Sequence, residues 1–170
     1  MELLNTLDYL ATLAEVAGVF VGFAALVSTL KARETDSEKA VELTMNVVIV
    51  TTSALAIFAA LLPIGIAQFT SAENFIWRTS SQILLLFEFG TIYMTTRLSG
   101  FSAAHRTRGL ESYSGWAVEA FILVPLILCA LDLLPEYNGA LYFLAVLALI
   151  VQAIFLFVGF VVRMSGDSRP

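Results

Sequence analysis

The sequence predicts an all-α integral membrane protein: a polytopic helical bundle of five transmembrane helices, with the N-terminus outside and the C-terminus in the cytoplasm. Of its 170 residues, 59% are hydrophobic and only 14% are charged, whereas soluble domains carry about 25% charged residues. The mean hydropathy is +0.87, and apolar runs long enough to cross a bilayer recur along the chain. In addition, Lys and Arg gather in alternate loops, as in membrane proteins of fixed orientation.

Five apolar segments have the length of a membrane span, and we expect residues 1–170 to form one domain built from them. A helix needs about 20 residues to cross about 30 Å of hydrocarbon. The expected spans are residues 9–30, 43–69, 75–98, 116–134 and 140–162. The chain begins MELLNTLDYL, without a basic stretch, so we interpret the first span as a retained helix and not as a signal peptide.

The orientation follows from the basic residues. When the loops are assigned alternately to two sides, residues 31–42, 97–115 and 163–170 hold eight Lys and Arg, and the other side holds only Arg78. The eight are Lys31, Arg33, Lys39, Arg97, Arg106, Arg108, Arg163 and Arg169. Since basic loops stay in the cytoplasm, the N-terminus is predicted to lie outside. The expected location of the protein is a bacterial cytoplasmic (inner) membrane.

Aromatic residues lie near several of the expected span ends. Tyr9, Trp77, Tyr137 and Tyr142 fall near outer ends and Trp116 near an inner one. Because Trp and Tyr favour the membrane–water interface, we expect these side chains to lie there.

Turn residues mark two of the connections. Thr35 and Glu38 have the spacing of a capping box and predict an early start of the second helix. Pro135 and Gly139 predict a tight turn that makes the fourth and fifth helices an antiparallel hairpin.

Two prolines lie inside expected spans. Pro63 and Pro125 each remove one helical hydrogen bond, so kinks are expected near both. The alternatives are a gating role and an ordinary packing role, since proline is common in membrane helices.

The first span has a stripe of small and polar residues. At about 100° per residue, one side of this helix is small or polar and the opposite side is bulky and apolar. The stripe comprises Ala11, Glu15, Gly18, Gly22, Ala25 and Thr29. Such a stripe is typical of close helix packing, and the alternative is that it lines a water-filled pore.

Two glutamates are placed at membrane depth by the expected spans. Glu15 lies about 10 Å below the outer edge, and Glu88 lies near mid-membrane on a face shared with Thr91 and Thr95. Gln152 occupies the centre of the fifth span. A charge at the centre of a spanning helix costs about 2.5–3.5 kcal/mol, so these carboxyls need an explanation.

Three explanations remain open for Glu15 and Glu88, because no Lys or Arg lies in the central part of any span. Each could be a neutral hydrogen-bond donor to a neighbouring helix, a site for an exchangeable proton or cation, or the partner of an Arg near a helix end or in another subunit. Glu119 and Asp132 lie closer to span ends, so we expect Glu119 to reach the inner interface and Asp132 to be in water.

Catalytic and cofactor chemistry has little support in the sequence. There is one histidine, His105, and one cysteine, Cys129, and no zinc-protease, serine-hydrolase or P-loop signature. We therefore expect no enzyme activity, no metal and no cofactor. The formal net charge of −5 does not favour binding to nucleic acid, which requires a basic surface.

The sequence favours a homo-oligomeric channel or transporter for protons or small cations in the lipid bilayer, with Glu15, Glu88, Thr91, Thr95 and Gln152 along the pathway. One alternative is a non-transporting membrane subunit or assembly protein whose polar stripes are helix contacts. Another is an intramembrane enzyme that uses Glu88 or Glu119.

Overall fold

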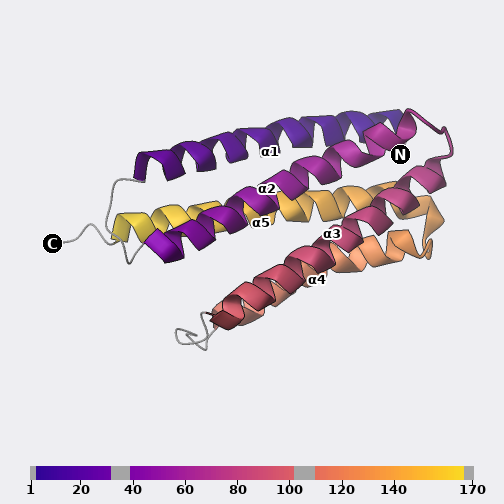
Figure 1. Ribbon diagram of the computed structural model, residues 1–170. Coiled ribbons are helices and arrows are strands. Elements are labelled where there is room, and N and C mark those ends of the chain that lie inside the picture. The colour runs from indigo at the N-terminus through magenta and orange to yellow at the C-terminus, as the bar shows by residue number, and fades with distance from the viewer. Residues whose placement is uncertain (1–2, 32–38, 102–109, 167–170) are drawn as a thin grey trace.

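The protein is all-helical in its described part. The structure, a computed structural model, describes residues 3–31, 39–101 and 110–166, although the side chains near several helix ends lie outside the description. These residues form five α-helices and a short 3₁₀ turn (Figure 1). The elements are α1 (Leu3–Lys31), α2 (Lys39–Ala67), α3 (Glu73–Phe101), α4 (Leu110–Ala130), η2 (Pro135–Tyr137) and α5 (Asn138–Gly166).

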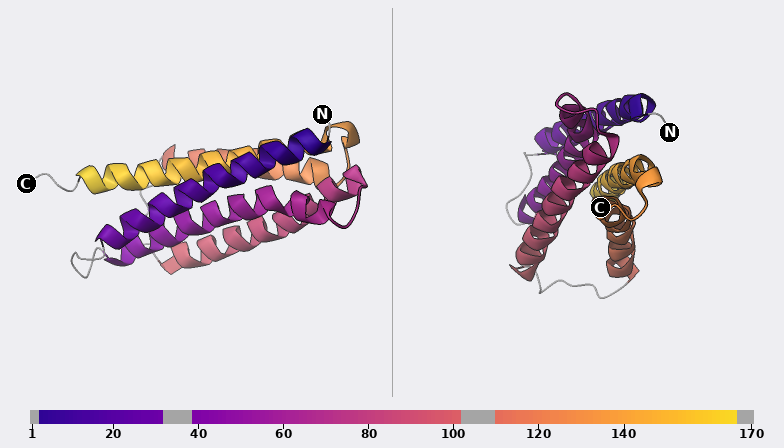
Figure 2. Two further views of the ribbon diagram at one scale, coloured as in Figure 1. Left: turned by 90° about the horizontal axis from the view of Figure 1, so that it is seen from above. Right: turned by 90° about the vertical axis from the view of Figure 1, so that its right-hand side faces the viewer.

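The helices run alternately in opposite directions along one bundle. The start of α1 and the end of α5 therefore lie at opposite ends (Figure 1). Helix α1 packs mainly on α2, α5 packs on both α4 and α2, and α3 contacts α4 and α2. Toward the end where α3 stops and α4 begins, these two helices diverge from one another (Figure 2).

Three of the helices meet the length and apolarity of a membrane span within the described residues. The qualifying stretches are Leu4–Phe23, Ile49–Ala67 and Pro135–Gly159, and α4 contributes a shorter apolar helix, Val118–Ala130. The prediction of an all-helical bundle is confirmed, and three of its helices are long and apolar enough to cross a membrane. Helix α3 carries more polar side chains than the others and does not qualify, so five spans and their orientation remain predictions.

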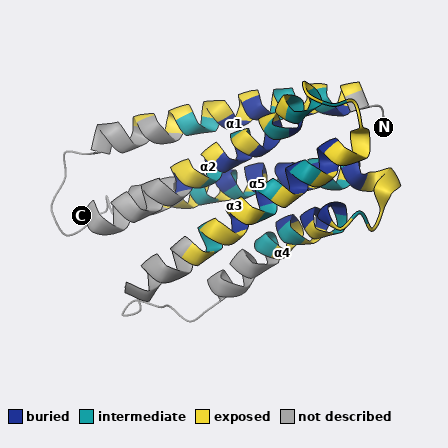
Figure 3. Cartoon of the chain, turned by 45° about the vertical axis from the view of Figure 1, so that its right-hand side comes forward, coloured by how far each residue is buried: buried dark blue, intermediate teal, exposed yellow. Residues whose placement is uncertain are grey.

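The outer surface of the bundle is apolar. Large hydrophobic side chains are exposed on every helix, including Val19, Leu61, Leu86, Phe121 and Phe155. The buried and exposed residues alternate around each helix, with the buried side turned toward the other helices (Figure 3). Because water does not favour contiguous apolar surface of this extent, the exterior suits contact with lipid.

Small residues let the central helices pack closely. Ala56, Ala59 and Ala60 of α2 and Ala145 of α5 are fully buried in the core cluster. Pro63 is also buried, and α2 continues as a helix through it. Pro125 is likewise buried inside α4. Both prolines are therefore buried inside continuous helices, and the kinks expected near them remain predictions.

Two of the aromatic residues expected at the interface are core residues instead. Trp77 and Tyr142 are 1% and 0% exposed, and their rings pack at a centroid distance of 5.8 Å. Both also have hydrogen-bond partners inside the protein: the Trp77 Nε1–H donates to Glu73 Oε1 and the Tyr142 hydroxyl to a carbonyl of α2. Only Tyr9 and Tyr137 are exposed, as expected for interfacial residues; the side chain of Trp116 lies outside the description.

The predicted α4–α5 hairpin is present, and Pro135 lies in its turn as expected, whereas Gly139 does not. Asp132 has a φ of 56°. The Leu133 N–H bonds to the Leu128 carbonyl and the Asp132 N–H to the Cys129 carbonyl, which is the Schellman pattern that ends many helices. Gly139 lies inside α5 and not in the turn. The capping box at Thr35 and Glu38 lies outside the described residues.

Candidate functional site

Glu88 is the buried acid of the bundle. It lies one residue from the midpoint of α3, and only 3% of its surface is exposed. The Thr91 hydroxyl donates to the Glu88 backbone carbonyl at 2.8 Å and lies 3.4 Å from Glu88 Oε2. The other carboxyl oxygen, Oε1, is buried and has no hydrogen-bond partner. The predicted burial of Glu88, and its predicted neighbour Thr91, are thus both present.

A second glutamate lies on α4. The Gln152 amide of α5 donates from Nε2 to Glu119 Oε1 at 2.9 Å. The other carboxyl oxygen, Glu119 Oε2, is buried without a hydrogen-bond partner. The expectation that Glu119 reaches the inner interface is therefore wrong, because its side chain turns toward α5 instead.

A signal for the position of Glu119 was present in the sequence. Ile122, Leu126 and Cys129 follow it at three, seven and ten residues, which places all four on one face of a helix. These three residues are fully buried. A side chain in register with such an apolar stripe is directed into the bundle.

The two glutamates belong to one cluster, which we call the Glu88–Glu119 site and define as Glu88, Thr91, Glu119 and Gln152. Glu119 lies close enough to Glu88 to act on it electrostatically. Each of Glu88, Glu119 and Gln152 lies within one residue of the midpoint of its helix. The site therefore joins α3, α4 and α5 at half the length of the bundle.

No basic side chain in the described part of the chain lies in this site. Among the side chains that the structure describes, the sole Lys or Arg is Arg78, which is exposed near the start of α3. The Gln152 amide thus donates to Glu119 and the Thr91 hydroxyl lies near Glu88 Oε2, while none of the described side chains supplies a counter-charge to the carboxyls. Thr95 was predicted to share this face, and its side chain lies outside the description.

The described residues hold no group of three or more His, Cys, Asp or Glu that could bind a metal ion. No family model, curated protein or solved structure matches this chain. The chemistry of the site is accordingly derived from its own residues.

Glu15 does not join the Glu88–Glu119 site. It lies near the midpoint of α1 but is exposed, since α1 packs into the bundle through Leu10, Ala14 and Ala17. Gly18 and Gly22 are exposed as well, and a Cβ built on either would meet no atom within 4 Å. Among the described residues, the stripe thus makes no close helix contact at these two glycines.

The remaining members of that stripe are less informative. Ala11 is half-buried, and the side chains of Ala25 and Thr29 lie outside the description. The structure of one chain is therefore compatible with either interpretation of the stripe, a pore lining or a contact with another subunit.

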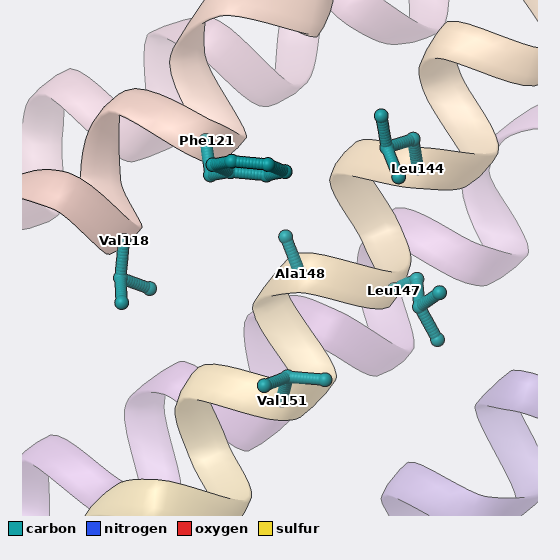
Figure 4. A pocket seen from close by; sticks show the side chains of 6 residues that line it. All are labelled: Val118, Phe121, Leu144, Leu147, Ala148 and Val151. Carbon is teal, nitrogen blue, oxygen red and sulfur yellow. The ribbon is translucent and has the colours of Figure 1, made fainter.

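An apolar groove of about 340 Å³ lies between α4 and α5 (Figure 4). Its lining residues are Val118, Phe121, Leu144, Leu147, Ala148 and Val151. None of them offers a polar side-chain atom to a substrate. The groove is thus part of the apolar exterior.

Proposed function

We propose that this chain is a five-span protein of the bacterial cytoplasmic (inner) membrane that moves protons or small cations through the Glu88–Glu119 site. The observation that carries the proposal is Glu88, which is 97% buried at mid-bundle and has a carboxyl oxygen without a partner. Ionisable residues within membrane spans are costly and mark ion paths and proton relays. A second carboxyl, that of Glu119, is close enough to act on Glu88 electrostatically, and it gives the site two places to hold a positive charge.

Five spans are supported by helix length. Helices α3 and α5 each have 29 residues, or about 44 Å at 1.5 Å per residue, which exceeds the hydrocarbon thickness of about 30 Å. Because α3 lies alongside helices that are apolar enough to span, it would cross the same bilayer. The clustering of Lys and Arg at one end supports the N-terminus outside.

A path along α3 would need to open. Ser81, Leu84 and Glu88 follow one another on one face of α3, and Leu84 is fully buried between the two polar residues. Buried apolar side chains can gate a path by excluding water. Leu84 is accordingly the proposed barrier between the Glu88–Glu119 site and the outer end of the bundle.

Assembly into a homo-oligomer through α1 is part of the proposal. Glu15 on the outer face of one chain would meet lipid at a cost of about 2.5–3.5 kcal/mol if it were charged at the helix centre. A second copy would cover it, and the open space at Gly18 and Gly22 would admit a closely approaching helix. Glu15 would then lie at the subunit contact or at a pore between subunits.

The test is flux into liposomes that contain the purified protein and a pH- or cation-sensitive dye. We expect flux in the wild type and at least a tenfold loss in Glu88→Gln and Glu119→Gln. Glu136→Gln is the matched control, because Glu136 is exposed in the α4–α5 turn, and it should retain full flux. Wild-type protein without flux, or full flux in both variants, would contradict the proposal.

The alternative is a non-transporting membrane subunit, and one observation favours it. The polar side chains Gln152 and Tyr142 already serve as hydrogen-bond contacts between helices. In that case the wild type would give no flux, and Glu88→Gln would fold with nearly unchanged stability because glutamine also donates a hydrogen bond.

A further inference from the structure

The Glu88–Glu119 site has two carboxyl oxygens that nothing in the described protein satisfies. Of the four, Glu88 Oε2 has the Thr91 hydroxyl nearby and Glu119 Oε1 accepts from the Gln152 amide. Glu88 Oε1 and Glu119 Oε2 are buried without a hydrogen-bond partner. Because an unpaired buried polar group is destabilising, and a charged one more so, these two oxygens require a positive charge or a proton.

The number of available ligands decides between a metal cation and a proton. Ca²⁺ takes about 6–8 oxygen ligands and Mg²⁺ requires about six in octahedral geometry. Membrane transporters supply further ligands from the carbonyls of unwound helices. Here α3, α4 and α5 are helical at Glu88, Glu119 and Gln152, so their carbonyls are engaged in helical bonds. Two unpaired carboxyl oxygens can hold a proton, whereas the described residues contain no group of three or more His, Cys, Asp or Glu that could hold a metal ion.

The charges around the Glu88–Glu119 site also favour a proton. Among the described side chains, the titratable residues of α4 are Glu119 and Cys129, and Asp132 lies in the turn that follows α4. The described part of α5 carries Tyr142, whose hydroxyl bonds to α2, and residues 49–67 of α2 carry no titratable side chain. Within the described side chains, the group that acts electrostatically on Glu88 is therefore another acid, Glu119. Two carboxylates sharing a buried site do not both ionise readily.

We propose that Glu88 and Glu119 hold one proton between them, so that the site accepts H⁺ and not a metal cation. The proton neutralises one of the two carboxyls, and the remaining negative charge is retained near the Thr91 hydroxyl and the Gln152 amide. The identification of H⁺ as the transported species rests on the proposed function; the shared proton itself does not.

Infrared spectroscopy of the wild type in liposomes tests the shared proton directly. We expect a protonated-carboxyl C=O band at neutral pH that persists when Na⁺, K⁺, Mg²⁺ or Ca²⁺ replaces a large organic cation at constant ionic strength. The band should disappear in the Glu88→Gln/Glu119→Gln double variant. In the Glu119→Gln variant, the Glu88 carboxyl should titrate at a different pH from the wild-type band, because the acid that acts on it has been removed.

Three results would overturn the proposal: no protonated-carboxyl band at neutral pH, a band that the metal cations abolish, or a band unchanged in the double variant. The wild-type measurements alone decide the matter if a variant fails to fold. A persistent band in a protein that gives no flux would support the shared proton and reject the transport function. Flux of Na⁺ or K⁺ in a protein without the band would support the transport function and reject the shared proton.

Discussion

The Tyr142 hydroxyl donates a hydrogen bond of 2.7 Å to the backbone carbonyl of Ala59. In an uninterrupted helix that carbonyl would accept from the N–H of residue 63, but residue 63 is proline and has no N–H. Helix α5 thus satisfies the carbonyl that Pro63 leaves free in α2. Where water is scarce, a neighbouring helix that supplies the missing donor makes a proline in a membrane helix tolerable.

Replacing Tyr142 with Phe should destabilise the protein, because it leaves the buried Ala59 carbonyl without this donor. We expect a loss of about 1–3 kcal/mol in the free energy of unfolding, measured by titration of the purified protein from mild detergent into SDS. Pro63→Ala restores the helical N–H, so Tyr142→Phe should cost less in a Pro63→Ala background. Equal costs in both backgrounds would show that the two residues are not coupled.

Adding a methyl group at Gly139 should disturb Trp77. A Cβ there would lie 3.2 Å from the Cε2 and Nε1 atoms of the Trp77 ring, which is itself buried and hydrogen-bonded to Glu73. Overpacking of a core costs about 1–3 kcal/mol, so we expect Gly139→Ala to destabilise by about 1 kcal/mol or more and to shift the Trp77 fluorescence in a Trp116→Phe background.

Gly65→Ala is the control for that variant, since a Cβ at Gly65 would meet no atom within 4 Å and alanine favours the helix. The Gly65→Ala variant should have a free energy of unfolding equal to that of the wild type or slightly higher. If Gly139→Ala behaved in the same way, the close approach of α5 to Trp77 would be refuted.

The turn after α4 depends on Asp132. Its φ of 56° disfavours most side chains, and its Oδ1 accepts from the Asn138 amide at 2.7 Å. Asp132→Ala loses the hydrogen bond and keeps the strain, whereas Asp132→Gly loses only the bond. We therefore expect unfolding to show alanine about 1 kcal/mol worse than glycine; equal stabilities would argue against the left-handed conformation.

Gln152→Leu should weaken the contact between α4 and α5. The substitution preserves most of the side-chain volume but removes the donor to Glu119 Oε1. Interhelical hydrogen bonds in membranes contribute about 0.6 kcal/mol on average and about 1.7 at most, so the unfolding titration should show a loss in that range. A gain in stability would show that the hydrogen bond from Gln152 to Glu119 does not stabilise the contact between α4 and α5.

The orientation can be tested by thiol accessibility. Cys129 is buried and can be replaced by Ala to give a cysteine-free background. A membrane-impermeant thiol reagent applied to intact cells should label Asn5→Cys, Ser71→Cys and Glu136→Cys and spare Ser37→Cys and Ser168→Cys until the cells are opened. Labelling of residues 5 and 168 from the same side would exclude an odd number of spans.

The sequence by itself determined the helical class, the approximate positions of the five helices and the burial of Glu88. These features depend on local quantities, namely the apolarity of successive stretches, the helical period and the cost of a carboxyl among apolar neighbours. The α4–α5 hairpin was likewise predictable, because the polar turn between its two apolar segments is short.

Only the tertiary structure decided which polar groups meet. It turned Glu119 toward Gln152 of α5, 33 residues along the chain, and left Glu15 on the outside of α1. It also placed Tyr142, 83 residues away, on the carbonyl freed by Pro63. The physical reason is that the helical period fixes which residues share a face, whereas the rotation of each helix about its axis is set by packing against its neighbours, and packing is a property of pairs of helices.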